Sequence, residues 1–343
     1  MTRFLIVGLG SIGRRHLRNL LALGQSDIVL CRSGKSNLPA DELSSFPTET
    51  DLKTALIRYR PQAVIVSSPT ALHLPVALEA AKAGCHLLIE KPVSHQMEGI
   101  EELQNIVEKE GVQVLVGYQF RFHPSIRYIR QILGEGSIGR PLWARAHWGE
   151  YLPDWHPWED YRLGYSARKD LGGGVLLTLC HPFDYLLWLF GKPLGVLAYK
   201  GTLGELNIDV EDLAEVILQY NLPFVASVHL DYLQRPPSHS LSIGGTHGSI
   251  EWNYASGEVR IYRLDNQSSG KPSQPQIFSL PHAFERNEMF LAEMRHFLDV
   301  IEGKCAPICT LEEGIASLQI VLAAHQAAHE GRQVILSNAF TPS

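Results

Sequence analysis

The chain has 343 residues, of which 45% are hydrophobic and 19% are charged, and its formal net charge is -6. This composition excludes a disordered chain and favours a globular protein of two domains. It also argues against a nucleic-acid-binding surface, which would need a cluster of basic residues that the sequence does not contain.

Strand and helix signals alternate in the N-terminal third of the chain. Short apolar runs predict strands at residues 4–7, 28–30, 63–66, 86–89 and 112–116. Helical spacing predicts helices at residues 14–23, 75–83 and 97–109. Because strands separated by helices form parallel βαβ units with right-handed crossovers, we expect a doubly wound α/β Rossmann domain that binds a dinucleotide over residues 1–121.

The pattern changes after Pro124, where strand-like segments follow one another directly. They cover residues 142–148, 195–200, 212–220, 224–232, 239–244, 249–253 and 258–262. Helical patterns at residues 183–189 and 311–330 bracket these strands, and the composition of residues 264–282 indicates an exposed loop. We therefore expect residues 122–343 to form an α+β domain with a large, mostly antiparallel open sheet, which binds the substrate and mediates oligomerisation.

A glycine-rich motif, Gly8-Leu9-Gly10-Ser11-Ile12-Gly13, follows the first predicted strand and opens the first predicted helix. Gly8 permits a tight turn, Gly10 lets the backbone approach a pyrophosphate, and Gly13 lets the helix pack on the strand. The N–H groups of the helix N-terminus, at Ser11 and Ile12, then face the anion. In this context the motif predicts a dinucleotide site rather than an ordinary strand–helix turn.

The end of the second predicted strand indicates which dinucleotide binds. NAD usually requires a carboxylate there, which hydrogen-bonds to the ribose 2′-hydroxyl, whereas this strand ends in Cys31-Arg32-Ser33. Arg32 and Ser33 can instead hold a 2′-phosphate through charge-assisted hydrogen bonds. We therefore favour NADP(H) over NAD(H), the alternative being that Arg32 is solvated and NAD binds without this contact.

Further motifs follow the glycine motif in order. They are Arg15-His16, then Ser67-Ser68-Pro69-Thr70 with His73, then Glu90-Lys91-Pro92, then Gly117-Tyr118-Gln119 with Arg121 and Phe122, and finally Gly172-Gly173-Gly174 followed by His181, Asp184 and Trp188. Together they resemble the glucose–fructose oxidoreductase, inositol dehydrogenase and rhizopine catabolism (Gfo/Idh/MocA) family over nearly the whole chain. The resemblance implies further cofactor contacts from Ser67, Pro69, Thr70, His73, Glu90, Lys91, Gln119 and Arg162.

The resemblance also implies the catalytic residues, since in that family the lysine of Glu90-Lys91-Pro92 and the histidine of the glycine-led helix face the reacting carbinol. Lys91 follows a parallel strand, at the edge where open α/β sheets bind ligands. Hydride leaves a carbinol carbon more easily as the hydroxyl proton departs, which a base titrating near neutrality and a cation on the oxygen promote. We therefore expect Lys91 and His181 to be catalytic, rather than a surface lysine and a core histidine.

One position departs from the family pattern. Members commonly carry an aspartate one turn before the histidine, and this position corresponds to Thr178. A carboxylate on the same helical face would stabilise an imidazolium, whereas a threonine cannot do so by charge. Pro182 would interrupt the helix, which is therefore kinked or begins at Pro182.

The segment from Tyr151 to Arg162 combines four aromatic residues with Arg162 and three carboxylates. Aromatic faces pack on sugar C–H groups and charged side chains bond hydroxyls, so this segment is expected to cover the substrate, with Trp158 in contact; the alternative is that its tryptophans belong to the core. The other expected substrate contacts are Lys91, Arg121, Thr178 and His181. His123 is equally compatible with a substrate contact and with a structural role.

These observations predict an NAD(P)-dependent dehydrogenase or reductase of a sugar, cyclitol or nucleotide sugar. A catalytically impaired sugar- or cofactor-binding regulator and a reductase of a non-sugar carbonyl remain as alternatives on the same fold. Five scattered cysteines indicate reduced thiols without a metal site. No apolar run is long enough to span a membrane, and no secretory signal is recognised, so we expect a cytoplasmic protein that does not bind a membrane. We also expect no nucleic-acid partner. Because an extended sheet leaves one face for a partner, we expect a homodimer or homotetramer through the second domain.

Overall fold

The computed structural model of the chain describes residues 2–34, 41–264, 274–280 and 284–336. The chain packs into two compact units. The first unit comprises Met1–Gln119, Asp170–Gly172 and Arg286–Leu318, and the second comprises Phe120–Lys169, Gly173–Glu285 and Gln319–Ser343. Each unit contains one β-sheet.

The sheet of the first unit is parallel throughout, in the order β3-β2-β1-β4-β5-β6. Its strands are β1 (Phe4–Val7), β2 (Ile28–Cys31), β3 (Thr48–Glu49), β4 (Ala63–Val66), β5 (His86–Glu90) and β6 (Val114–Gly117). Continuous apolar runs form β1, β2 and β4 because both faces of the sheet are buried. The strand order reverses between β1 and β4, where doubly wound sheets bind ligands beyond the carboxyl ends of the strands.

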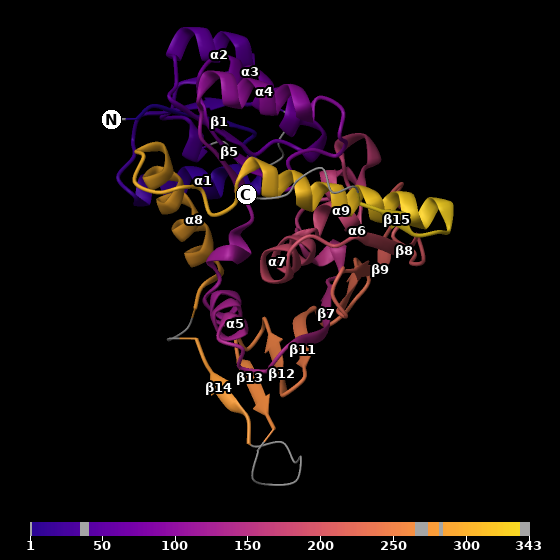
Figure 1. Cartoon of the computed structure of the whole chain (residues 1–343). Helices are drawn as coiled ribbons and strands as arrows, with labels where there is room; N and C mark the ends of the chain where they lie inside the picture. Colours follow the sequence, from indigo (N-terminus) through magenta and orange to yellow (C-terminus); the bar gives the residue numbers. More distant parts are fainter. Residues whose placement is uncertain (1, 35–40, 265–273, 281–283, 337–343) are drawn as a thin grey trace. The chain divides into compact units, whose positions relative to one another are not determined.

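Helices cover both faces of this sheet. They are α1 (Ser11–Ala22), α2 (Leu52–Tyr59), α3 (His73–Lys82), α4 (Ile100–Glu110) and α8 (Arg286–Ile301). Figure 1 shows α2, α3 and α4 on one side, and α1 and α8 on the other. The sequence did not predict α8, which returns late in the chain to pack on α1, where the Arg15 guanidinium lies 4.6 Å from the ring centre of Phe290.

The second unit is built on a nine-stranded sheet in the order β14-β13-β12-β11-β7-β10-β9-β8-β15. The strands are β7 (Pro141–Gly149), β8 (Gly195–Gly201), β9 (Leu213–Gln219), β10 (Val225–Asp231), β11 (Ser238–Gly245), β12 (Gly248–Asn253), β13 (Val259–Arg263), β14 (Gln276–Phe278) and β15 (Val334–Ile335). Among these, β7 and β10 pair in parallel and the other pairs are antiparallel. The predicted fold class is confirmed, but β14 lies in the segment expected to be a loop, of which residues 265–273 and 281–282 are outside the described residues.

The two faces of this sheet differ. Helices α6 (Val175–Thr178) and α7 (His181–Phe190) pack on β7, β9 and β10, and α7 also contacts α5 (Pro124–Gly134). On the strands beneath, buried residues alternate with exposed ones; the exposed large side chains of β7 to β10 are Trp143, Leu197, Tyr199, Ile217 and Val225. The period of two leaves one face of this sheet open in the chain described here.

The remaining elements are short, apart from α9 (Leu311–Glu330), whose residues belong partly to each unit. Short 3₁₀ helices are η1 (Asp41–Leu43), η2 (Thr70–Leu72), η3 (Gln119–Phe122), η4 (Leu152–Asp154), η5 (Tyr161–Leu163), η6 (Tyr165–Ala167) and η7 (Lys169–Leu171). None of the five cysteines, which all lie in described segments, forms a disulfide. No single helix among the described residues has the length and apolarity to cross a membrane; the bent pair Lys169–Thr178 and His181–Phe190 passes on length and composition alone.

Candidate active site

The glycine motif forms a tight turn between β1 and α1. Gly8 has a φ of +94°, and a side chain there would collide with the backbone of Ser67 and Ser68, 2.6 Å away. The hydroxyl of Ser67 donates to the carbonyl oxygen of Gly8 at 2.8 Å. A side chain at Gly13 would collide with the same carbonyl. Gly8 and Gly13 are therefore required by the packing of this chain against itself.

Gly10 is different, because a Cβ atom placed on it would have no neighbour within 4 Å. The space that a side chain would fill is left open beside the N-terminus of α1, which has no side-chain cap and no acidic residue in its first turn. The buried guanidinium of Arg14, which the sequence analysis did not single out, donates to the Leu9 carbonyl oxygen at 3.1 Å and braces the turn. These features fit the pyrophosphate of a dinucleotide.

The edge beyond β2 carries charges of both signs. Arg32 is half-buried and Ser33 is exposed. Burial, followed by the charges of Asp51 and Glu49, raises the pKa of the Cys31 thiol to about 11. These two carboxylates therefore act on the last residue of β2. The Arg32 backbone N–H donates to the Glu49 carbonyl oxygen at 3.0 Å.

Lys91 follows directly on β5 and is half-buried, and its neighbour Glu90 is buried. His16 Nε2 lies 2.7 Å from the Glu90 Oε1 atom. Burial would raise the pKa of the Glu90 carboxyl, but the hydrogen bond and charge of His16 and the charge of Lys91 hold it below its usual value. Glu90 is thus an anion that fixes the start of the Lys91 segment.

His73 joins two of the predicted cofactor segments. Its Nε2 atom lies 2.8 Å from the Ser68 carbonyl oxygen, and its Nδ1 atom lies 2.8 Å from that of Pro92. The ring is buried, and burial lowers the pKa of His73. His73, with buried Thr70 at η2, therefore ties the segment after β4 to the segment after β5.

In the second unit, the residues around His181 lie at a break between two helices. Thr178 ends α6 and His181 begins α7, and the helical stretch Lys169–Thr178 is bent by 48° from α7. Pro182 lies in the first turn of α7, where its missing N–H costs nothing. The expectation that the helix is kinked or begins at Pro182 is confirmed, since a new helix begins at His181 after a bend.

Glu211 positions the short helix that precedes His181. Its side chain accepts the Leu176 N–H at 3.2 Å, and its backbone carbonyl oxygen accepts the Val175 N–H at 3.2 Å. Gly174, with a φ of +103°, leaves the room that the carboxyl group of Glu211 occupies. A carboxylate at this helix start satisfies N–H groups that have no partner within the helix.

The imidazole of His181 is buried among aromatic rings that the sequence analysis did not single out. The centre of the Phe120 ring lies 5.0 Å away, and the Trp148 indole stacks at 5.5 Å with an interplanar angle of 21°. Trp148 also stacks on His239 at 4.2 Å. The alternation of buried and exposed residues in β7 could have indicated that Trp148 is buried. That Trp148 stacks on His181 could not be predicted from the sequence, because it depends on the tertiary fold.

Arg121 and His123 both lie in the interior of the second unit. Arg121 is fully buried and binds both carboxylate oxygens of Asp184, with a shortest distance of 2.7 Å. Its guanidinium therefore anchors α7. His123 accepts the Ser125 N–H at 3.1 Å and caps α5, and burial lowers the pKa of His123 to about 4. This arrangement supports the structural interpretation of His123.

The segment from Tyr151 to Arg162 has both core and exposed aromatic residues. Trp155 packs edge-on against Tyr232 with centroids 5.5 Å apart, whereas Trp158 is 68% exposed. Arg162 is exposed and pairs with Asp160 at 2.8 Å. Trp155 thus belongs to the core, as the alternative interpretation expected. Trp158 is the tryptophan of this segment that is exposed enough to contact a substrate.

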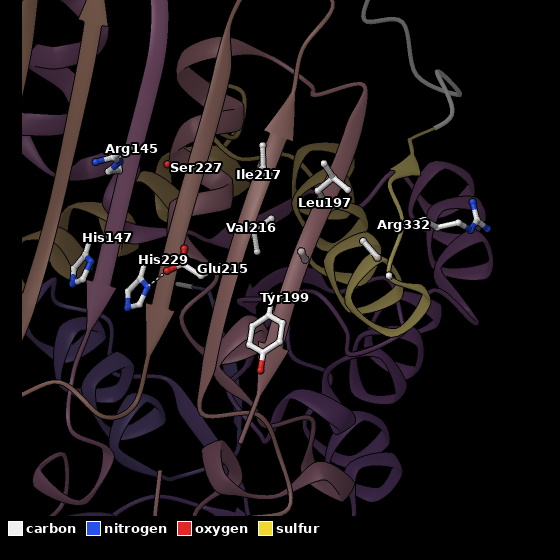
Figure 2. Close-up of a pocket in the computed structure, with 13 residues that line it drawn as sticks. Arg145, His147, Leu197, Tyr199, Glu215, Val216, Ile217, Ser227, His229 and Arg332 are labelled. Carbon is white, nitrogen blue, oxygen red and sulfur yellow. Dashed lines mark hydrogen bonds and ion pairs between the residues drawn. The ribbon is translucent and has the colours of Figure 1, made fainter. Parts of the chain in front are cut away.

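A hollow of about 690 Å³ lies elsewhere, on the open face of the second sheet. Figure 2 shows His147, His229 and Glu215 side by side there, on β7, β10 and β9. His229 lies 2.5 Å from Glu215 and 2.9 Å from Asp231. The hydrogen bond with Asp231, followed by that with Glu215, raises the pKa of His229 to about 9. His147, His229 and Asp231 each offer one atom to a cluster within 4.8 Å, close enough to bind a metal ion in competition with the proton on His229.

Comparison with known proteins covers both units. Residues 2–118 match the model of the oxidoreductase family NAD-binding Rossmann fold (GFO_IDH_MocA), and residues 130–336 match that of the family's C-terminal alpha/beta domain. The chain is 25% identical to a 1,5-anhydro-D-fructose reductase of Ensifer adhaerens, over 97% of this chain and 98% of that one.

A second relative carries a different name. The chain is 25% identical to a 2,7-anhydro-N-acetylneuraminate hydratase of Mediterraneibacter gnavus, over 97% and 96% of the two chains. Among solved structures, levoglucosan dehydrogenase in complex with NADH and levoglucosan has a TM-score of 0.85, at 19% identity over 97% and 99% of the two chains. At that identity the likeness establishes the fold.

Proposed function

The chain belongs to the Gfo/Idh/MocA oxidoreductase family, and we propose that it transfers a hydride between a nicotinamide cofactor and a carbinol or carbonyl carbon of a sugar, cyclitol or nucleotide sugar. Relatives named as dehydrogenases and reductases of such compounds, among them a UDP-N-acetylglucosamine 3-dehydrogenase and a scyllo-inositol 2-dehydrogenase, support this substrate class. The chain is an enzyme of NAD(P)-dependent CH–OH oxidation or reduction.

The observation that carries the proposal is the cofactor cradle of the first unit. Gly8, Gly10 and Gly13, with the backbone N–H groups of Ser11 and Ile12, would hold the pyrophosphate. The bound nicotinamide supplies or accepts the hydride. Pro69, Thr70, His73 and Glu90 complete the predicted contacts from the segments after β4 and β5, and Gln119 and Arg162 are proposed contacts from outside them.

Lys91 and His181 are the residues that we assign to the chemistry. The Lys91 ammonium stabilises negative charge on the carbinol oxygen as its proton leaves. His181 accepts that proton in the oxidative direction and returns it in the reductive direction.

Substrate recognition is assigned to Trp158, the exposed aromatic side chain of the segment from Tyr151 to Arg162. An exposed indole can cover the apolar face of a pyranose or cyclitol ring. Arg121 contributes indirectly, since its bond to Asp184 fixes the helix that begins with His181. Thr178 is kept as a proposed hydroxyl contact.

Cofactor choice remains part of the proposal. Arg32 and Ser33 lie at the end of β2 without a carboxylate directly after the strand, which favours NADP(H). Glu49 and Asp51 lie near Cys31 and oppose a 2′-phosphate by charge. We propose that Arg32 decides the preference in favour of NADP(H), because it is the charged residue that directly follows β2.

Assembly is assigned to the open face of the second sheet. Its exposed large apolar side chains, among them Trp143, Leu197 and Ile217, form a surface that a second copy would bury. We propose a cytoplasmic homodimer or homotetramer, with the domain boundary at residue 121 separating a cofactor domain from a domain for substrate and assembly.

The alternative function is a regulator that binds cofactor and sugar without turning them over. The observation in its favour is Thr178, which supplies no carboxylate near the proton-transfer histidine. One experiment separates the two functions. The purified protein is mixed with NADP⁺ or NAD⁺ and a panel of anhydrosugars, cyclitols and nucleotide sugars, and the absorbance of reduced nicotinamide is followed. Turnover supports the enzyme, whereas binding without turnover supports the regulator.

A further inference from the structure

Helix α8 carries a carboxyl group into the interior of the first unit. Glu293 is fully buried, and its neighbours on the helix, Met289, Phe290, Met294 and Phe297, are buried and apolar. Neither carboxyl oxygen of Glu293 has a hydrogen-bond partner within the described residues. An ionised carboxylate without a partner is very costly in such a place, so a specific reason for this residue is needed.

The nearest titratable groups are His16 on α1 and Glu90 on β5. One oxygen or nitrogen atom of each of the three side chains lies within 4.8 Å of the others. His16 already bonds to Glu90 at 2.7 Å, and both are buried. Lys91 and His73 are the other charged or titratable groups that act on Glu90.

Two carboxyl groups this close cannot both ionise in a buried site, so one of them keeps a proton. His16 and Lys91 stabilise Glu90 as the anion. Burial, followed by the charge of Glu90, raises the pKa of Glu293 well above its usual value. Glu293 is therefore the protonated member of the pair.

A protonated carboxyl group is a hydrogen-bond donor, and Glu90 has acceptor capacity to spare. Within the described part of the chain, Glu90 Oε1 accepts from His16, and Oε2 lies 3.4 Å from the Lys91 backbone nitrogen. Gly117 lies opposite Glu90 in the sheet, and a Cβ there would already lie 3.4 Å from the Glu90 carboxyl carbon. The Glu90 carboxylate is thus in contact with several neighbours, and a second strong hydrogen-bond donor would hold it in one orientation.

We propose that Glu293 is an uncharged hydrogen-bond donor to Glu90, directly or through one water molecule, and that it acts with His16 as a positioning residue for Lys91. The role of Lys91 in this inference rests on the proposed function. Glu293 itself contacts neither substrate nor cofactor; it holds the carboxylate next to the lysine, so that the ammonium is presented in one orientation.

The first test does not depend on turnover. Infrared difference spectra of the full-length protein without cofactor, native minus Glu293→Gln, should show the C=O stretch of one protonated carboxyl group at pH 7 and at pH 8. Absence of this band at both values would overturn the proposal. One equivalent of divalent metal in the purified protein would also overturn it, because metal binding requires the carboxylate form.

The second test compares two variants of similar size. Glu293→Gln keeps an uncharged donor and should retain kcat, KM and the pH–rate profile within about threefold. Glu293→Leu removes the donor and should lower kcat by about 10- to 100-fold with little change in KM for the cofactor, as a misplaced catalytic group does. Glu312→Gln, an exposed change in α9, is the control and should behave as native.

The outcomes of the two tests are distinct. If Glu293→Gln loses as much kcat as Glu293→Leu, the donor role is contradicted. If Glu293→Leu does not fold, the infrared band and the Glu293→Gln kinetics still decide. If the band is present while no carbinol is turned over by the native protein, the proposed function fails and the protonation of Glu293 stands.

Discussion

The imidazole of His181 and the indole of Trp148 stack with ring centres 5.5 Å apart and an interplanar angle of 21°. An aromatic face attracts a cation, so the indole would favour the protonated form of His181, with Thr178 in place of an aspartate at the end of α6. The stack links a strand of the sheet to the first residue of α7.

We expect Trp148→Leu to shift the pH–rate profile toward lower pH by roughly half a unit, the effect of about 0.5–1 kcal/mol of cation–π attraction. Trp148→Phe is the matched control, because it also loses the bond from Trp148 Nε1 to Glu150 but keeps an aromatic face. Initial rates between pH 5 and pH 9 measure the effect. Equal profiles for the two variants would mean that the stack is packing alone.

Thr178→Asp tests the departure from the family pattern. A carboxylate at the end of α6 would favour the imidazolium at the start of α7, and the pH–rate profile should move toward higher pH. Thr178→Asn has the same shape without the charge and should leave the profile in place. Identical profiles for the native, Asp and Asn proteins would show that position 178 does not act on the proton-transfer group.

Arg32 tests the cofactor assignment. The native protein should bind NADPH more tightly than NADH, and Arg32→Ala should weaken NADPH binding by about tenfold or more, since a charge-assisted hydrogen bond is worth about 1.5–3 kcal/mol. Titration of the fluorescence of the reduced nicotinamide measures both affinities. Arg60→Ala, a change at the end of α2, is the control. Equal native affinity for the two cofactors would contradict the assignment.

His229 gives the second sheet a pH-dependent contribution to stability. The pKa of its imidazole is raised from 6.5 to about 9 in the folded protein, so its ion pairs with Asp231 and Glu215 stabilise the fold fully below pH 6.5. This contribution falls as the pH rises and is lost above about pH 9. The Tm should therefore decrease over this range, and His229→Gln should flatten the decrease. His329→Gln, an exposed change on α9, should not.

Five of the six strands of the first unit could be predicted from the sequence because they are short, mostly apolar runs, as in Phe4–Val7 and Ala63–Val66. The sixth, β3 (Thr48–Glu49), was not predicted, because it is two polar residues without an apolar run. Gly8 and Gly13 could also be predicted, because the turn between a strand and a helix requires them locally. Helix α8 was missed, although its buried Met289, Phe290, Met294 and Phe297 recur at helical spacing. That it packs on α1 is a tertiary fact, and so is the cluster of Glu293, Glu90 and His16.

The surroundings of His181 could not be predicted for a related reason. Phe120, Trp148 and His239 come from three distant segments, η3, β7 and β11, which the tertiary fold brings together. The buried ion pair of Arg121 and Asp184 could not be predicted either. A charged residue in a sequence motif is usually interpreted as a site residue, whereas here the pair is buried and structural.

The central claim is that Lys91 and His181 carry a nicotinamide-dependent hydride transfer, and the most direct measurement is single-turnover formation of reduced nicotinamide with a substrate from the sugar panel. The account predicts that His181→Ala lowers this rate by roughly 10²–10⁴-fold and that Lys91→Ala lowers it at least as much, with cofactor affinity nearly unchanged for His181→Ala. Native rates of hydride transfer in both variants would contradict it.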